Sequence, residues 1–252
     1  MKKTIFSIVI SITSLCAFSL SAQDAAGEIR YLTVHNWSKK MAALDYLTKQ
    51  QRERIAYMWG NRSEWKVYTK LYFNSSGSRY EDSEEHAEAD MEGFSWRKDA
   101  YRINRDFSEN KVSDQMTLLG KTYVIEDTLQ PQAWKILNDM KEVAGHVCMN
   151  ATWQDTIKQQ NIIAWFALDL PVPGGPERFC GLPGLILEVD INDGAQVITA
   201  DRMQLRELTD ELEPPKKVKG KRIDEAEYQA IIKKHIEEKR KSEEPWFWGI
   251  RY

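Results

Sequence analysis

The stretch that most constrains the fold runs from Pro171-Val172-Pro173-Gly174-Gly175-Pro176 to Gly181-Leu182-Pro183-Gly184-Leu185-Ile186. Between positions 171 and 184 the backbone meets four prolines and four glycines, and it then continues as Leu187-Glu188-Val189, which is typical of a strand. Because proline fixes φ and glycine readily adopts φ > 0, this segment follows one defined path. We predict that Gly181, Pro183 and Gly184 are structural and form a fixed turn before a buried strand, and that Gly184→Val is strongly destabilising if Gly184 adopts a positive φ.

Most of the remaining chain alternates apolar and polar residues with period two, which indicates half-buried strands. In Trp65–Phe73, the apolar residues at 65, 67, 71 and 73 share one face, and Lys66 and Lys70 lie on the other. Asn192-Asp193-Gly194 is a strong signal for a hairpin turn. Similar runs are Ile29–Trp37, Ala100–Phe107, Gln115–Leu119, Thr122–Glu126, Ala133–Leu137, Gly145–Trp153, Ile162–Leu168, Leu185–Ile191 and Gln196–Asp201.

Two segments have helical periodicity instead. Lys39–Met58 carries a loose apolar stripe, and Thr48 with Gln51 can form a capping box within it. Asp224–Lys241 places apolar residues at i, i+3, i+4 and i+8 from Tyr228. We therefore predict an α+β fold, built mainly from a curved antiparallel sheet in the form of a half-barrel, with one or two helices covering its concave side. This shape is similar to that of periplasmic lipoprotein carriers, an analogy of fold alone.

The N-terminus resembles a secretory signal peptide, with a basic start at Lys2 and Lys3, a mostly apolar run to Leu20 and small residues at 21 and 22. We predict a signal peptide at residues 1–22 and a single domain at residues 23–252. The apolar run is short and interrupted by serines, so we expect no transmembrane span after cleavage. The protein is then exported to the periplasm or associated with the outer membrane.

Charge excludes one class of partner. Without Lys2 and Lys3, 33 of the 35 basic side chains remain against 38 acidic ones. The resulting net charge of −5 favours solubility and argues against nucleic-acid binding.

Three groups of motifs resemble the GLPGLI family, which is named after the hexapeptide at 181–186. They are Lys70-Leu71-Tyr72-Phe73-Asn74; Trp134-Lys135-Ile136 with Gly145-His146-Val147-Cys148-Met149-Asn150-Ala151; and Ala164-Trp165-Phe166 with Asp169-Leu170-Pro171 and Gly175-Pro176. His146 and Asn150 stand where the family usually has tyrosine and lysine. The resemblance implies an exported β-rich envelope protein of Bacteroidota, often encoded near outer-membrane TonB-dependent transporters. It carries over no catalytic residues, because none are agreed for the family.

Two interpretations of the cysteines remain open. Cys148 and Cys180 are an even pair in an exported chain, which most simply predicts a disulfide that attaches the Pro/Gly-rich loop to a strand. Alternatively, His146, Cys148 and Met149 hold copper or zinc, since positions 146 and 148 point to the same face of a strand. The metal site requires Cys148 to be a free thiol.

Nine tryptophans and ten tyrosines exceed the needs of a core of this size, so we expect an exposed aromatic contact surface. Its candidates are Tyr68 and Tyr72 on one strand face and Trp246 and Trp248 near the C-terminus, where we predict a final strand that docks into the sheet. Thr128 and Thr156 follow aspartate in short patterns typical of envelope O-glycosylation, although a plain turn threonine explains each as well.

The sequence has no G-x-S-x-G, H-E-x-x-H or phosphate-binding glycine loop. We therefore expect a non-enzymatic envelope protein without a cofactor, which binds a partner or ligand as an accessory to an outer-membrane TonB-dependent transporter. The alternative is a metal-binding envelope protein that uses the His-x-Cys-Met cluster.

Overall fold

The structure is a computed structural model and describes residues 25–59, 64–85, 87, 99–213 and 217–252. The predicted signal peptide at 1–22 lies outside these ranges. No helix within them is long and apolar enough to cross a membrane.

The described residues form a single sheet of twelve strands. Its order is β12-β6-β5-β4-β3-β2-β1-β11-β10-β9-β8-β7, and every neighbouring pair is antiparallel except β12–β6. The strands are β1 Gly27–Asn36, β2 Glu64–Phe73, β3 Gly77–Asp82, β4 Tyr101–Asp106, β5 Lys111–Leu118, β6 Lys121–Thr128, β7 Lys135–Val143, β8 His146–Asp155, β9 Gln160–Ala167, β10 Leu185–Ile191, β11 Gln196–Leu205 and β12 Lys221–Ile223.

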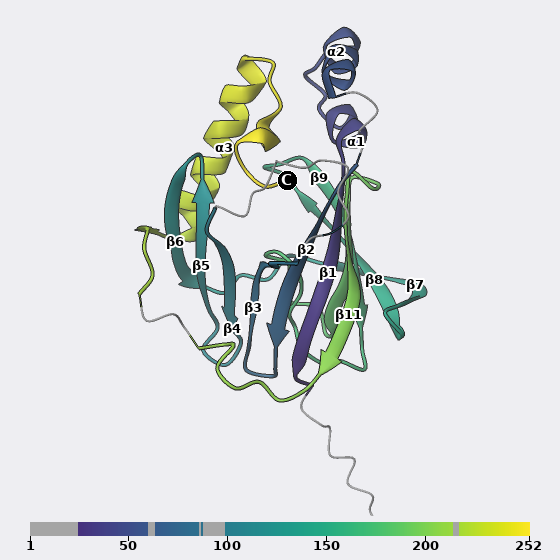
Figure 1. The fold of residues 1–252 in the computed structure, drawn as a ribbon, viewed down its shortest axis with the longest axis vertical. Helices are drawn as coiled ribbons and strands as arrows, with labels where there is room; N and C mark the ends of the chain where they lie inside the picture. Colours follow the sequence, from purple (N-terminus) through teal and green to yellow (C-terminus); the bar gives the residue numbers. More distant parts are fainter. Residues whose placement is uncertain (1–24, 60–63, 86, 88–98, 214–216) are drawn as a thin grey trace, which may run out of the picture.

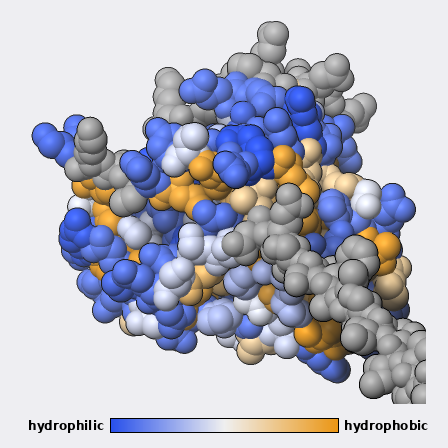
Figure 2. All heavy atoms as spheres, turned by 90° about the horizontal axis from the view of Figure 1, so that it is seen from below, coloured by the Kyte–Doolittle hydropathy of each residue, from blue (hydrophilic) through white to orange (hydrophobic). Residues whose placement is uncertain are grey.

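The sheet curves but does not close, because β12 and β7 remain as separate edges (Figure 1). The predicted α+β fold with a curved, mainly antiparallel sheet is therefore confirmed. Its inner face carries the core, in which Ile29, Tyr31, Leu71, Phe166 and Ile198 have no exposed surface. Seen from below, hydrophobic residues reach the surface as separate patches between hydrophilic ones (Figure 2).

The first helical segment is two helices rather than the single one predicted for Lys39–Met58. α1 spans Trp37–Ala42 and α2 spans Lys49–Trp59. The capping box explains the break: the Gln51 backbone N–H donates to Thr48 Oγ1 at 3.2 Å and the Thr48 N–H donates to Gln51 Oε1 at 2.7 Å. A capping box marks a helix start, so α2 begins anew at this point.

The last helix, α3, spans Glu225–Lys241, with Asp224 as its N-cap. The Asp224 carboxylate accepts a hydrogen bond from the Glu227 backbone N–H at 2.8 Å. α3 packs beside β6 at the open side of the sheet and buries Tyr228, Ile232 and His235 (Figure 1). His235 also lies on the buried face of α3, although the apolar periodicity of the sequence includes only aliphatic and aromatic residues. Its Nε2 lies 2.9 Å from the Trp246 carbonyl oxygen, which explains how a polar ring is accommodated there.

The predicted C-terminal strand is wrong. Trp246–Trp248 form a short 3-10 helix, followed by irregular chain that lies in the mouth of the sheet (Figure 1). Trp246, Phe247, Ile250 and Tyr252 are all buried. The alternating aromatic pattern therefore reflects packing inside the curved sheet rather than pairing at its edge.

The connection between β9 and β10 contains the hexapeptide and folds back over the inner face of the sheet. The Gly181 N–H donates to the Pro173 carbonyl at 2.8 Å, and the Ile186 N–H donates to the Gly174 carbonyl at 3.0 Å. Tyr31 on β1 donates its hydroxyl to the Ile186 carbonyl at 2.6 Å. These bonds support the predicted fixed turn before a strand, and Leu185, Ile186 and Leu187 are fully buried.

Of the two hexapeptide glycines, it is Gly181 that has a positive φ, at +90°, so the condition of a positive φ at Gly184 is not met. Gly184 is required for a different reason. A Cβ built on it would lie 2.1 Å from the backbone oxygen of Ala167 on β9. The absence of a side chain lets the turn approach the neighbouring strand closely.

We predict that Gly184→Ala lowers the free energy of unfolding by about 3 kcal/mol, because a backbone oxygen must move to admit the methyl group. Gly174→Ala in the same connection is the matched control, since its Cβ would meet nothing closer than 3.4 Å. Urea unfolding of both variants checks this, and equal stabilities would contradict the steric explanation.

Candidate functional site

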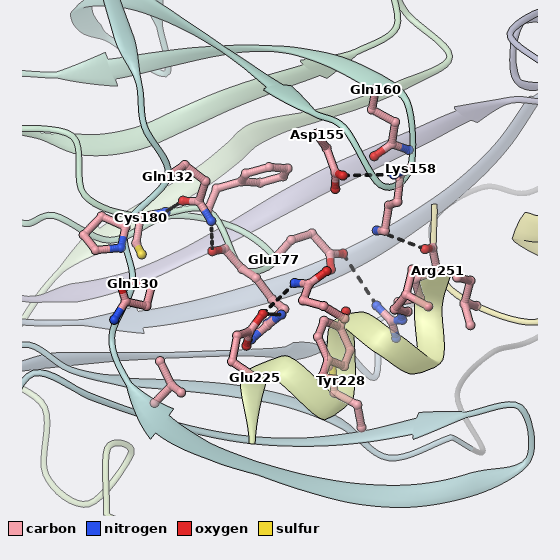
Figure 3. A pocket seen from close by; sticks show the side chains of 18 of the residues that line it. Gln130, Gln132, Asp155, Lys158, Gln160, Glu177, Cys180, Glu225, Tyr228 and Arg251 are labelled. Carbon is pink, nitrogen blue, oxygen red and sulfur yellow. Dashed lines mark hydrogen bonds and ion pairs between the residues drawn. The ribbon is translucent and has the colours of Figure 1, made fainter. Parts of the chain in front are cut away.

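A cavity of about 380 Å³ opens between the inner face of the sheet, α3 and the C-terminal segment (Figure 3). Its walls come from β4 and β5, the turn between β8 and β9, the connection before the hexapeptide, and the buried face of α3. This volume falls in the range of small-molecule sites. Together with the connection between β6 and β7, which also lines it, parts of the chain that are distant in sequence meet around this cavity.

A buried ion network forms one wall of this cavity. Asp114 on β5 has no exposed surface and binds two guanidinium groups, Arg105 Nη1 at 2.5 Å and Arg178 Nε at 2.9 Å. Arg178 also binds Glu225 on α3 in a bidentate pair, with distances of 3.2 and 2.5 Å. Its guanidinium lies 4.3 Å from the Tyr228 ring centre. Fixed geometry of this kind holds α3 against the sheet.

Glu177 points to another part of the cavity, although it precedes Arg178 directly. It accepts hydrogen bonds from the hydroxyls of Tyr80, at 3.3 Å, and Tyr101, and Arg251 Nη1 lies 3.7 Å away. Burial raises the pKa of Glu177 to about 7, although Arg251 acts against this. Its φ is +52°, in the left-handed region that residues other than glycine rarely adopt.

The C-terminal segment closes the cavity from the side of the open mouth. Arg251 binds both carboxylate oxygens of Asp82 at 2.7 and 2.5 Å, and its guanidinium lies 3.2 Å from the Tyr101 ring centre. The Trp246 and Tyr252 rings are stacked, with centres 5.4 Å apart. The Tyr252 hydroxyl accepts a hydrogen bond from Asn192 at 2.7 Å.

Lys158 and Gln160 lie at the turn between β8 and β9, and both line the cavity. Gln160 is 3% exposed, and its Nε2 makes no hydrogen bond of normal geometry, although it interacts with the Tyr252 hydroxyl. Lys158 Nζ donates to the Arg251 carbonyl at 3.4 Å, and no ion pair to it occurs in the described part of the chain. Figure 3 shows the two side chains next to each other, with Arg251 opposite Lys158.

A second buried amine lies behind the C-terminal segment. Lys40 on α1 is 2% exposed, and its Nζ contacts His35 Nδ1 at 2.7 Å and Gln196 Oε1 at 3.1 Å. It also lies 4.1 Å from the Tyr252 ring centre. Burial, with repulsion from Lys158, lowers the pKa of Lys40 well below its usual value. We assign this amine to the attachment of the C-terminal segment.

The predicted disulfide is not formed in the structure, where Cys148 and Cys180 are separate free thiols, both buried. The charged groups that influence Cys148 are Asp169, Lys141 and Glu188. Those around Cys180 are Arg105, Arg178 and Asp114. The two sulfur atoms therefore have different surroundings, since one belongs to the β7–β9 region and the other to the cavity wall.

Two residues of the alternative metal site, which stays a prediction, have other contacts in the structure. His146 Nδ1 pairs with Asp169 Oδ2 at 2.7 Å, and Cys148 Sγ contacts the His146 carbonyl oxygen at 3.6 Å. No group of three or more His, Cys, Asp or Glu residues that could hold a metal ion occurs within the described ranges. Burial raises the pKa of the Cys148 thiol to about 11, which opposes the thiolate form that a metal requires.

The predicted aromatic surface divides into two kinds of residue. Tyr68 and Tyr72 on β2 are partly exposed, and the Arg30 guanidinium lies 4.2 Å from the Tyr68 ring centre. Trp248 is 40% exposed, but Trp246 is only 2% exposed, so its assignment to a contact surface is corrected to the core. Thr128 and Thr156 are exposed, and their glycosylation stays a prediction.

Sequence reasoning missed Glu177, Arg178, Lys158, Gln160 and Arg251. A signal for the first pair exists, because a glutamate and an arginine interrupt a segment that the Pro/Gly pattern already assigns to a fixed path. Charged residues in a fixed, inward-folded loop must find buried partners. Lys158 and Gln160 have no such signal, since polar residues are ordinary in a hairpin turn.

We predict that Trp246→Ala lowers the free energy of unfolding by about 3–5 kcal/mol, because it removes a fully buried indole. Trp248→Ala is the matched control and should change it by less than about 1 kcal/mol. Denaturant unfolding of the two variants checks this. If the Trp246→Ala protein is as stable as wild type, the assignment of Trp246 to the core is wrong.

We predict that the pH dependence of stability contains a contribution from Glu177. Its folded pKa of about 7 lies above its ordinary value of 4.5, so its stabilising effect is present below pH 4.5 and is lost as pH rises to 7. Relative to wild type, Glu177→Gln should therefore gain up to roughly 3 kcal/mol between pH 4.5 and 8. Urea unfolding of wild type and Glu177→Gln at several pH values measures the difference. Parallel stability profiles would contradict the prediction.

Comparisons with known proteins show the fold but give no function. The chain is similar to PNGF-II in two crystal forms, with TM-scores of 0.53 and 18% and 17% identity. The match covers 82% of this chain but only 32% and 33% of PNGF-II, so the chain spans about a third of that protein's length. An uncharacterized conserved protein from Thermus thermophilus gives a TM-score of 0.37 at 8% identity, covering 81% of this chain and 92% of its own. No curated protein matches.

Residues 153–188, which include the hexapeptide, match the family model described as "Protein of unknown function (Porph_ging)", and the resemblance to the GLPGLI family is thereby confirmed over that segment.

Proposed function

We propose that this protein is a non-enzymatic binding protein, and that its ligand occupies the cavity between α3 and the inner face of the sheet. The single observation that carries the proposal is the buried amide of Gln160. It is 3% exposed and lines the cavity, yet its Nε2 makes no hydrogen bond of normal geometry and interacts only weakly with the Tyr252 hydroxyl. Buried polar groups in proteins are almost always hydrogen-bonded, so a ligand atom is the natural acceptor.

The construction of the cavity supports binding to a preformed site. The Arg178–Asp114 and Arg178–Glu225 contacts fix the wall formed by β5 and α3, at 2.9 and 2.5 Å. Arg251 fixes the opposite wall through Asp82. A site whose side chains are already held by one another loses little conformational entropy when a ligand enters.

The wider setting follows from the family resemblance. We propose that the protein is exported to the cell envelope and binds its ligand as an accessory to an outer-membrane TonB-dependent transporter. Co-purification of the protein with outer-membrane proteins tests this part separately. If the protein binds a ligand but never co-purifies with outer-membrane proteins, the proposed ligand site stands and the proposed association with a transporter is wrong.

The central experiment compares two buried glutamines. Gln160→Leu removes a donor that makes no hydrogen bond of normal geometry, so it should leave the protein at least as stable as wild type while abolishing ligand binding. Gln196→Leu is the matched control, because Gln196 is 2% exposed but accepts a hydrogen bond from Lys40 Nζ at 3.1 Å. It should lower the melting temperature without removing a donor from the cavity, because Gln196 does not line it.

Binding itself is measured by two-dimensional ¹H–¹⁵N NMR with a library of small carboxylates, amides, amines and polyols. We expect at least one class of compound to shift the amides of residues 153–160 and 225–232 in wild type and in Gln196→Leu, but not in Gln160→Leu. If no compound shifts these amides, or if Gln160→Leu binds like wild type, the proposed site is wrong.

A further inference from the structure

We infer that the ligand is a small organic carboxylate, whose oxygens accept hydrogen bonds from Lys158 Nζ and Gln160 Nε2 and whose apolar body lies against α3. The inference rests on the proposed function, and it adds the chemical class of the ligand. Four observations carry it: the placement of the two donors, the pairing of the three arginines on the cavity wall, the partial desolvation of the lysine, and the apolar side chains that also line the cavity.

The two donors are held by one hairpin. Asp155 closes the turn after β8, because its Oδ1 accepts the backbone N–H groups of Ile157 and Lys158, each at 2.9 Å. Gln159 then takes a φ of +55°, and β9 begins at Gln160. The turn thereby brings Lys158 and Gln160 to the same side, where both line the cavity (Figure 3).

The other strong donors around the cavity are already engaged by protein acceptors. Arg105 and Arg178 share Asp114, and Arg178 also holds Glu225. Arg251 is taken up by Asp82. The side chains of Lys158 and Gln160 therefore have hydrogen-bond donors left for a ligand, and a ligand with acceptor oxygens would match them.

The lysine also needs a negative partner. Burial lowers the pKa of Lys158; attraction by Asp155 partly opposes this, and repulsion by Arg178 adds to it. Its only hydrogen-bond acceptor among the described residues is a neutral carbonyl, 3.4 Å away. A ligand carboxylate at this point would offset the desolvation of the ammonium group and make a charge-assisted hydrogen bond.

The cavity lining also includes apolar side chains that can contact the body of a ligand. They are Met116, Phe179, Tyr228, Ile232 and Ile250. Met116, Ile232 and Ile250 are each at most 2% exposed to solvent. A cavity of about 380 Å³ admits a ligand with one carboxylate and a short aromatic or aliphatic chain.

The test uses phenylacetate, 3-phenylpropionate and octanoate, each beside its neutral primary amide, with affinities from NMR titration. We expect each bound carboxylate to bind about tenfold or more tightly than its amide. Lys158→Gln should lower the carboxylate affinity about tenfold and leave the amide affinity nearly unchanged. Lys121→Gln, an exposed lysine on β6 outside the cavity, is the matched control and should bind like wild type.

The outcomes separate the two proposals. If amides bind in the cavity as tightly as carboxylates, or if Lys158→Gln binds carboxylates like wild type, the carboxylate inference is wrong and the cavity remains a binding site. If none of the three carboxylates binds while another library class does, the result is the same. If nothing in the library binds at these residues, both proposals fail.

Discussion

The buried carboxylate of Asp114 is the interaction on which the rest of the structure depends. It sits on β5 with no exposed surface, and it holds Arg105 of the adjacent strand and Arg178 of the β9–β10 connection at 2.5 and 2.9 Å. A buried ion without partners costs several kcal/mol, so these groups must stay together. Because Arg178 continues to Glu225 on α3, one carboxylate fixes a strand pair, the loop and the helix relative to one another.

This network also determines where Glu177 lies. Arg178 is held toward Asp114, and the left-handed backbone of Glu177, with a φ of +52°, turns its side chain toward Tyr80 and Tyr101. The opposite wall depends on a second pair, Arg251 with Asp82, which anchors the C-terminal segment. Two ion-pair groups on opposite walls thus keep a space between α3 and the sheet that hydrophobic packing alone would tend to close.

The sequence predicts the sheet well and the cavity poorly, for a physical reason. Strand periodicity, the turn at Asn192-Asp193-Gly194 and the helical periodicity of Asp224–Lys241 are local features, and each appears in the structure where local chemistry places it. β3 escapes the pattern because its residues Ser78 and Arg79 are polar yet buried, and β12 is only three residues long. The cavity residues come from elements distant in sequence, so no local pattern joins Lys158 to Arg251 or Arg178 to Glu225. The expected disulfide fails similarly, because an even count of cysteines carries no information about the distance between them.

The unused donors at Lys158 and Gln160 have a cost in the ligand-free protein. A buried amide without a hydrogen bond of normal geometry and a desolvated ammonium each reduce the free energy of unfolding, by on the order of 1–3 kcal/mol for the amide. The structure would be more stable with apolar side chains at both positions, such as Met116 and Ile232 provide elsewhere in the cavity lining. Arg178 nearby is paired with two carboxylates, whereas Lys158 and Gln160, which lie on one hairpin, have no such partners. A ligand that supplies the missing acceptors would recover that cost on binding, which makes the same two side chains a source of affinity and of specificity for acceptor oxygens.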